Sequence, residues 1–481
     1  MFKAIFNTFT NCFKIPELKS RIIFTLAVLA ICRSVALVPI PGLDGAALSS
    51  YFEQLAKQHK GDQGLIGMYS MFTGGALEKC AIGSLGIMPY ISATIIIQLL
   101  SAVYAPLSKL SREEGGRTKI IQYGRYLTVL LCLGQGLVMA IGWENAGNIF
   151  QGFNGKLVQG FEGKWWFIDK IWFYRFETML ILTAGTVLMM WLGEQISDRG
   201  IGNGVSLVIT IGILARLPHA AVGVWDMFVP PPGGERAHLC NGIARGAMFF
   251  GVVAGVIAVT QAQRKIPVQY AQRSVGRKVY AGGSSFMPLR VNYAGVMPII
   301  FAQAILMFPE KLFLTLGKIL KGSGTDKSAV AVTLGNFFES FGTLFSHGSF
   351  TYMLFYGGMI LFFSYFWVAT QFNEIQISDD LKKHGGYIPG VRPGQATTDF
   401  LHRTMSRITL AGAIFLTIIA VIPILLYRAI KVPFEVAQFF GGTSLLIMVG
   451  VMLDTMRQME SHLLMRHYDG FMKKGRIRGR F

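Results

Sequence analysis

The chain has 481 residues, of which 52% are hydrophobic and only 15% are charged. This composition is too apolar for the wet surface of a soluble globule, so it indicates a protein that has lipid as its solvent. Five scattered cysteines without paired spacing predict small packed side chains rather than a disulfide framework or a metal site. The formal net charge of +19 requires an explanation through membrane topology or acidic partners.

Ten apolar segments are candidates for helices that cross a bilayer, whose hydrocarbon core needs ~20 residues of helix. They lie at about 22–38, 82–104, 120–142, 174–193, 203–217, 242–262, 291–313, 352–372, 404–426 and 433–453. The fifth segment is short and flanked by glycine. A further half-length segment at about 65–81 is too brief to span, which predicts a re-entrant or plug-like piece.

Lysine and arginine gather in alternate loops. If the N-terminus is cytoplasmic, the inside loops include 105–119, 261–290 and 373–403, and the basic tail at 457–481 joins them. The opposite loops are short or mix both signs of charge, as at 43–64. By the positive-inside rule this asymmetry predicts cytoplasmic termini and explains most of the net charge.

Two of the inside loops carry more than topology needs. Residues 261–290 hold six basic residues and no acid among prolines, tyrosines and glycines, a mixture that favours a β-hairpin. Residues 382–394 form a basic tip with glycine and proline at regular intervals, which predicts an ordered, protruding loop. Anionic lipid headgroups, an rRNA surface and an acidic motor protein would all suit these loops, and charge does not choose among them.

Two short phrases occur twice in the chain, in the same order. Gly86–Ile91 returns as Gly295–Ile300, and Gly204–Ile209 returns as Gly442–Ile447. Apolar segments interrupted by glycine or proline at matching places are typical of membrane proteins built from inverted repeats. The repeats therefore predict a channel or carrier with its pathway at the repeat interface.

Aligning the repeats pairs Ile91 with Ile300 and Ile209 with Ile447. Four apolar side chains from pseudosymmetric helices would then meet in mid-membrane. Such a ring blocks ions by dewetting and yields to a bulky polymer. The alternative is that these isoleucines face lipid or an ordinary core.

Catalytic signatures are absent from the sequence: it has no phosphate-binding loop, no zinc helix and no nucleophile elbow. The spans are nearly free of the carboxylates that ion-coupled carriers use, and Arg33 is the one charge deep in a span. Arg33 fits pairing with a neighbouring helix, outward snorkelling or a role in the pathway. A passive channel driven by a partner is therefore favoured over a secondary transporter of small solutes and over a membrane-embedded enzyme.

Several motifs closely resemble the SecY family, the central channel subunit of the bacterial Sec protein translocon. They occur in family order from about Pro16 to the tail: Met71–Leu77, Leu85–Ala93 with Ile95–Leu100, Trp191–Ile196, Arg199–Gly204, Pro389–Gly394 and Gly441–Ile447. The sequence departs from the family at Asn373-Glu374, where Asn-Pro is frequent, and in its longer outside loops at 43–64 and 143–172.

The resemblance implies an all-α polytopic membrane protein of ten transmembrane helices in two pseudosymmetric, inverted-repeat halves of five, with a short re-entrant plug helix at about 65–81. The halves would be 1–217 and 218–456, hinged between helices 5 and 6 and opening sideways to lipid between helices 2 and 7. Residues 457–481 would form a basic cytoplasmic tail.

The resemblance also implies the roles of particular residues. The pore ring would be Ile87, Ile91, Val205, Ile209, Ile300 and Ile447; the plug would include Phe72, Gly74 and Gly75; the lateral gate would include Ser92, Gln98 and Gln303; and partners would dock on Arg264, Lys265, Arg273, Lys382, Lys383 and Arg392.

The function so implied is a protein-conducting channel of the bacterial cytoplasmic membrane, without catalytic residues, cofactor or metal. It would translocate unfolded secretory polypeptides and release membrane segments sideways into lipid. The implied partners are SecE-like and SecG-like small membrane subunits, SecA, the ribosome through rRNA, signal peptides with their preproteins, and membrane lipids.

Overall fold

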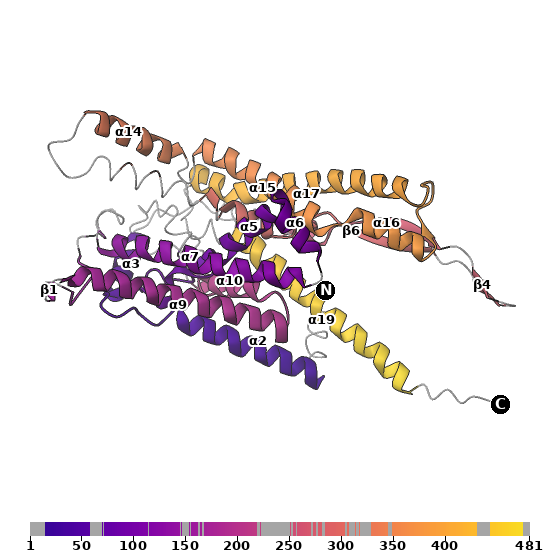
Figure 1. The fold of residues 1–481 in the computed structure, drawn as a ribbon, viewed down its shortest axis with the longest axis horizontal. Helices are drawn as coiled ribbons and strands as arrows, with labels where there is room; N and C mark the ends of the chain where they lie inside the picture. Colours follow the sequence, from indigo (N-terminus) through magenta and orange to yellow (C-terminus); the bar gives the residue numbers. More distant parts are fainter. Residues whose placement is uncertain are drawn as a thin grey trace, which may run out of the picture. The chain divides into compact units, whose positions relative to one another are not determined.

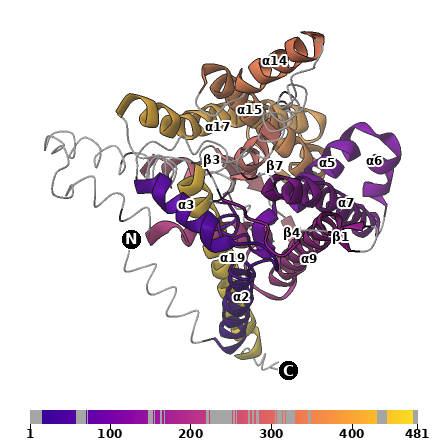
Figure 2. The same ribbon diagram turned by 90° about the vertical axis from the view of Figure 1, so that its left-hand side faces the viewer.

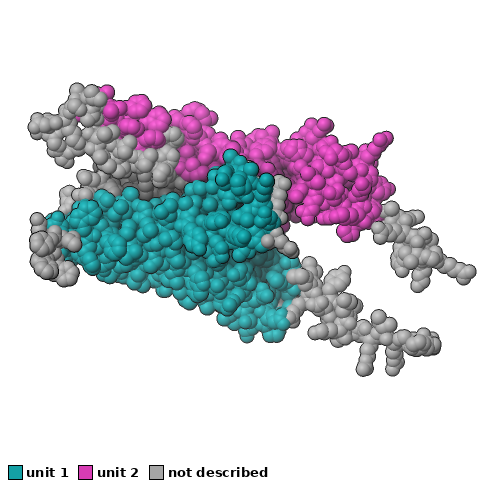
Figure 3. All heavy atoms as spheres, in the orientation of Figure 1, with its two compact units in different colours: residues 1–221, 447–481 teal, residues 222–446 magenta. Residues whose placement is uncertain are grey.

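The fold is mostly helical in the computed structural model. It describes residues 15–57, 70, 72–113, 115–144, 146, 153, 155–161, 164–165, 168–218, 222, 251, 254–255, 257–270, 273–275, 278–280, 284–303, 305–306, 313, 317, 329–344, 349–430 and 443–474. The chain divides into two compact units, residues 1–221 with 447–481 and residues 222–446 (Figure 3). Each unit is held together by its own core.

The first unit is built around one long helix. Its elements are α2 (Pro16–Val35), α3 (Gly45–Lys57), η1 (Ile82–Leu85), α5 (Met88–Val103), α6 (Ala105–Arg112), α7 (Gly116–Glu144), β1 (Lys164–Trp165), β2 (Ile168–Asp169), α9 (Lys170–Arg199), α10 (Gly204–Leu214) and most of α19 (Thr443–Lys474). Helix α9 packs against α2, α7 and α10 (Figure 1). Helix α5 contacts α9 as well, so α5 and α10 share α9 as a neighbour.

The second unit combines paired helices with a small sheet. Its described elements are β3 (Gln263–Tyr270), β4 (Arg273–Val275), β5 (Lys278–Tyr280), β6 (Ser284–Arg290), α14 (Ala329–Leu344), α15 (Phe350–Gln371), α16 (Glu374–Lys383), β7 (Gly386–Tyr387) and α17 (Gln395–Ile430). Helices α15 and α17 pack together, and α16 lies on α17 (Figure 1).

Five helical stretches in the described residues are long and apolar enough to cross a membrane: Ile82–Ser101, Thr118–Glu144, Lys170–Arg199, Phe350–Lys383 and Gln395–Ile422. They coincide with five of the ten expected segments, which confirms those five. Helix α2 covers most of the first expected segment, and α10 is a short apolar helix at the fifth. Much of 242–262, part of 291–313 and the start of 433–453 lie outside the described residues.

Helix starts follow from local chemistry. Pro89 stands in the first turn of α5, where its missing N–H costs nothing. The side chain of Asn203 accepts a hydrogen bond from Ser206 N and caps α10, and Ser349 caps α15 by accepting one from Tyr352 N. These caps fix the residues at which the apolar helices α10 and α15 begin.

The basic loop at 261–290 is a β-hairpin, as its composition predicts. Strands β3 and β6 pair antiparallel from Gln263 with Arg290 to Gln269 with Ser284. Along β3 the side chains of Ile266 and Val268 are buried and those between them are exposed. The hairpin therefore has one face in the core and one face in solvent.

The plug-like segment expected at about 65–81 is described only in part, because residues 65–69 and 71 lie outside the described residues, and its short helix stays a prediction. In its described part, Ser70 and Phe72 are helical, residues 73–80 form turns, and η1 follows. Gly74 and Gly75 have φ angles of +63° and +84°, which right-handed helix does not allow. We call the described residues of 70–81 the turn segment.

Three cysteines, Cys32, Cys80 and Cys132, are buried free thiols, as the scattered spacing predicts. Cys12 and Cys240 lie outside the described residues.

Candidate functional site

The two copies of the first repeated phrase share a positive φ angle at the glycine and the same first hydrogen bond of the helix. Gly86 has a φ angle of +59° and Gly295 one of +64°, a region that glycine enters without steric cost. In each copy the helix starts the same way: Ile91 N donates to Ile87 O at 3.2 Å, and Ile300 N donates to Val296 O at 3.3 Å. The repeat in the sequence is thus also a repeat in the structure.

Within the first unit, two expected pore-ring residues meet on α9. A Cβ at Gly193 would lie 3.6 Å from Ile87 Cδ1 and 3.6 Å from Val205 N. Because Gly193 has no side chain, the starts of α5 and α10 can both approach α9 at this point. Ile87 is buried and Val205 is half-buried.

The other ring candidates are buried. Ile91, Ile209 and Ile447 belong to the first unit and Ile300 to the second. Closure of a ring by all six side chains stays a prediction, and so does the lateral gate. Its candidates are Ser92 and Gln98, half-buried on α5, and Gln303, buried in the second unit.

The turn segment sits against α10 through two glycines. A Cβ at Gly74 would come within 3.0 Å of Gly212 Cα, and a Cβ at Gly212 would come within 2.9 Å of Phe72 O. Above the repeat glycine, a Cβ at Gly86 would lie 3.2 Å from the Thr73 methyl group. The turn segment therefore covers the start of α5 and contacts the last turn of α10 by direct backbone approach.

Two arginines hold the turn segment. Arg33 Nη1 on α2 donates a hydrogen bond of 2.7 Å to Gly74 O. Arg216, just after α10, forms an ion pair with Glu78, and Ser70 Oγ donates to Glu78 Oε1 at 2.7 Å. The sequence analysis singled out Arg33 but missed Arg216 and Glu78. The signal was visible, because Glu78 lies in the half-length segment 65–81 and Arg216 lies at the end of the apolar segment 203–217.

Described residues of the loops at 43–64 and 143–172 pack on each other and on the turn segment. Gln159 Nε2 donates to Asp44 Oδ2 at 3.0 Å, and Leu43 forms a β-bridge with Val158. A Cβ at Gly45 would collide with the Lys79 carbonyl oxygen. Burial raises the pKa of the Cys80 thiol to about 12, and the negative charge of the Asp44 carboxylate adds to this rise. The thiol therefore stays protonated.

The two basic loops form one surface in the second unit. Strand β7 pairs antiparallel with β3, so the sheet order is β6-β3-β7. Tyr387 OH donates to Gln269 Oε1 at 3.0 Å across this pairing. We call five exposed basic residues of these loops the basic surface: Arg264, Lys265, Lys382, Lys383 and Arg392. Of the predicted docking residues, Arg273 has its side chain outside the described residues.

The tip that carries Arg392 is fixed by glycines and hydrogen bonds. Gly390 and Gly394 have positive φ angles of +82° and +103°. Ser378 Oγ donates to Gly394 O at 2.9 Å, and Thr397 Oγ1 donates to Arg392 O at 2.9 Å. Beneath the sheet lies an apolar core that includes Ile266, Leu289, Val368, Phe372, Ile388, Leu401 and Met405. The exposed guanidinium of Arg392 thus stands on an ordered base.

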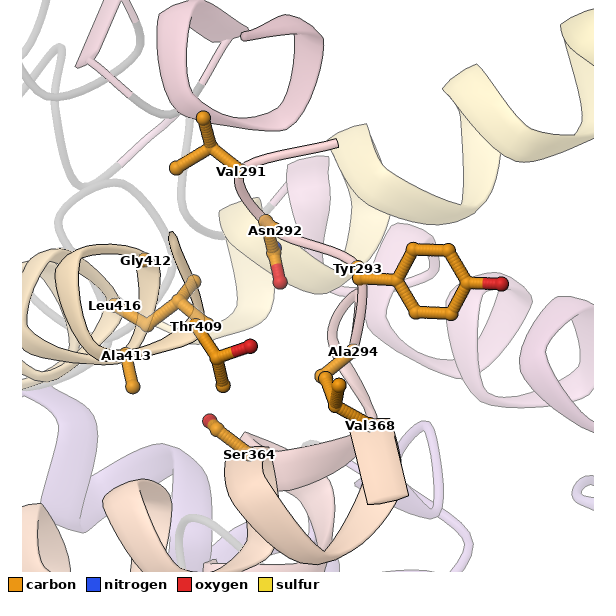
Figure 4. A pocket seen from close by; sticks show the side chains of 10 residues that line it. All are labelled: Val291, Asn292, Tyr293, Ala294, Ser364, Val368, Thr409, Gly412, Ala413 and Leu416. Atoms are coloured by element: carbon orange, nitrogen blue, oxygen red, sulfur yellow. The ribbon is translucent and has the colours of Figure 1, made fainter. Parts of the chain in front are cut away.

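A short segment joins strand β6 of the basic hairpin to Gly295, where the second copy of the first repeated phrase begins. Residues 291–294 follow β6 and line a small pocket with α15 and α17 (Figure 4). A Cβ at Gly412 would collide with the Val291 carbonyl oxygen, so α17 approaches this segment closely. Asn292 Nδ2 and Thr409 Oγ1 are buried there without a hydrogen-bond partner among the described atoms.

The cytoplasmic ends predicted for α2 and α19 also meet. Leu18 and Ile22 pack with Met459 and Leu463 where α19 runs beside α2 (Figure 2). In the part of the chain that the structure describes, no cluster of His, Cys, Asp or Glu side chains could hold a metal ion.

Comparisons with known proteins agree over nearly the whole chain. The SecY family model matches residues 81–456. The protein named protein translocase subunit SecY of Chlamydia trachomatis is 38% identical to this chain over 476 residues, covering 98% of this chain and 99% of that protein. The corresponding protein of Thermotoga maritima is 40% identical over 479 residues, covering 99% and 100%. That of Vibrio cholerae is 40% identical over 466 residues, covering 97% and 96%.

Solved structures show the same fold. A protein-conducting channel superposes with a TM-score of 0.56 at 17% identity, covering 92% of this chain and 91% of that one. A SecY channel studied for its plug domain gives 0.52 at 17% identity, with the same coverage. Sequence identity over almost the full length and a shared fold lead to one conclusion: the chain belongs to the SecY family.

Proposed function

We propose that the chain forms a passive, gated channel that conducts unfolded secretory polypeptides across a membrane and releases membrane segments into lipid. The observation that carries this proposal is the repeated left-handed glycine, at Gly86 and Gly295, each followed by a buried isoleucine at the start of a helix. An apolar constriction built in this way excludes ions by dewetting and can widen around a polymer. The names and near-complete coverage of the relatives support the same role.

The proposed architecture is ten transmembrane helices in two inverted-repeat halves, 1–217 and 218–456, with a cytoplasmic tail at 457–481. In it the six ring residues form the throat, and the turn segment with Phe72, Gly74 and Gly75 acts as the plug. Helix α5, with Ser92 and Gln98, faces the helix that carries Gln303 across the lateral gate.

The basic surface is proposed as the docking site for the driving partner. Five cations on an ordered base would bind acidic protein or phosphate, with an affinity that falls as salt rises. SecA and the ribosome are the proposed partners, and the solved relatives include a Sec61 channel in a canine ribosome–channel complex. SecE-like and SecG-like subunits would complete the channel in the bacterial cytoplasmic membrane, with both termini in the cytoplasm.

The test is transport by the purified complex in vesicles. We expect an unfolded preprotein to cross only when SecA and ATP, or a translating ribosome, are supplied. Uptake of a small labelled solute down an ion gradient, with no partner and no preprotein transport, would contradict the channel and favour a secondary transporter.

A further inference from the structure

We propose that Arg33 and Arg216 are positioning residues that clamp the turn segment in its closed place, and that the strength of this clamp sets how rarely the idle channel opens. The inference rests on the proposed function, because it assumes that the turn segment is the plug. Both arginines lie in the first unit, together with Gly74, Glu78 and Ser70.

The first contact is a hydrogen bond from a charged donor to a backbone oxygen. Arg33 is half-buried on α2, and its Nη1 lies 2.7 Å from Gly74 O. A Cβ at Gly74 would lie 2.6 Å from the same nitrogen, so only glycine leaves room for the guanidinium. The φ angle of Gly74, +63°, also suits glycine. Position 74 thus meets two separate demands, a left-handed turn and access for Arg33.

The second contact is an ion pair a few residues further along. Arg216 pairs with Glu78, and their side chains are only 14% and 21% exposed, so salt and water screen the pair weakly. Ser70 Oγ donates to the same carboxylate and receives a hydrogen bond from Arg216 Nη2. One guanidinium thereby ties the two ends of the turn segment together.

The two contacts act on one small body from two helices. Arg33 comes from α2 and Arg216 from the end of α10, and these helices contact each other. The glycine pair Gly74 and Gly212 provides a close backbone seat between them. Moving the turn segment away would leave a carboxylate and two guanidinium groups without these partners, which costs free energy in a partly buried place.

Breaking either contact should therefore increase the fraction of idle channels that are open. The informative variants are Glu78→Gln, which removes the carboxylate charge, and Arg33→Gln, which removes the donor charge. The matched control is Arg175→Gln. Arg175 forms an ion pair with Glu144 at 2.8 Å with 20% and 22% exposure, in the same unit, and neither residue belongs to the turn segment.

The readout is resting ion conductance of the purified complex in planar bilayers, without preprotein. We expect about a tenfold rise for Glu78→Gln and for Arg33→Gln, equivalent to about 1.4 kcal/mol, and no rise for Arg175→Gln. The charge exchange Glu78→Arg with Arg216→Glu should recover part of the seal that Glu78→Gln loses. Arg33→Lys should leak less than Arg33→Gln because it keeps the charge.

Wild-type conductance in Glu78→Gln would overturn the clamp, and so would an equal rise in Arg175→Gln. If Arg33→Gln does not fold, Glu78→Gln with its charge exchange decides alone. The same preparation of the unchanged chain is tested for transport of a preprotein driven by SecA. Failure of that transport would contradict the proposed function, whereas a failure of the clamp would leave transport intact.

Discussion

The two copies of the repeated phrase share a positive φ angle at their glycine but have different surroundings. At Gly86 a Cβ would lie 3.2 Å from the Thr73 methyl group of the turn segment, whereas no described atom lies within 4 Å of a Cβ at Gly295. The second copy instead follows directly on β6 of the basic hairpin, through residues 291–294. The comparison shows one backbone design used twice, with a covering segment added in the first unit and a basic surface added in the second.

If the turn segment serves the seal and the basic surface serves the driving partner, damage to the basic surface should abolish driven transport. The low resting conductance should stay unchanged. Arg392→Glu reverses an exposed charge on the tip between Gly390 and Gly394 and leaves the spans unchanged. We expect preprotein import into inverted vesicles to collapse, while channel abundance by immunoblot and resting conductance stay normal. Full import at normal abundance would show that the basic surface serves topology alone.

The shared part of the design should respond alike in both units. Asparagine at Ile91 and, separately, at Ile300 puts a polar side chain where the repeats place an apolar one. Because a wetted constriction conducts ions, each variant should raise the resting conductance several-fold. Unchanged conductance in both variants would contradict the assignment of these residues to the pore ring. A rise in Ile91→Asn alone would contradict equivalent roles for Ile91 and Ile300.

The covered and uncovered glycines should differ in their tolerance of alanine. At Gly295 alanine would meet the strain of a positive φ angle, about 1–2 kcal/mol, and no described atom lies within 4 Å of its Cβ. Gly86 combines a φ angle of +59° with a ψ angle of −151°, a region almost exclusive to glycine, and Thr73 stands over it. We therefore expect Gly86→Ala to lower the melting temperature of the purified complex more than Gly295→Ala. Equal losses would mean that the turn segment does not rest on this position.

The smallest expected effect concerns the pocket beside residues 291–294. Thr409 Oγ1 is buried there without a partner among the described atoms, so valine, which has nearly the same shape, removes an uncompensated polar group. Thr409→Val should stabilise the complex by about 1 kcal/mol without changing conductance. A lower melting temperature would show that the hydroxyl makes a contact that stabilises the fold.

Local patterns in the sequence predicted much of this fold. Apolar runs located the helices α7, α9 and α15, since lipid demands ~20 consecutive apolar residues. The prolines, tyrosines and glycines at 261–290 predicted the hairpin. The internal repeat located Gly86 and Gly295, because a left-handed turn before a helix requires glycine.

Contacts between distant residues were not predictable in this way. Strand β7 has two residues and no pattern, so nothing local indicated that the tip near Arg392 would pair with β3. Glu78 and Arg216 are 138 positions apart, and each alone is an ordinary charge near the end of an apolar segment. The turns at residues 73–80 go with the positive φ angles of Gly74 and Gly75, which the apolar pattern of the sequence does not reveal.

The most direct test of the central claim is to place a photo-crosslinking side chain at Ile91 and, separately, at Ile300, and to arrest a preprotein during transport. The control position is Ile23, which is 51% exposed on the outer face of α2. A polypeptide channel with an apolar throat predicts crosslinks to the arrested chain from Ile91 and Ile300 but not from Ile23. Crosslinks from none of the three positions, or equally from all of them, would contradict it.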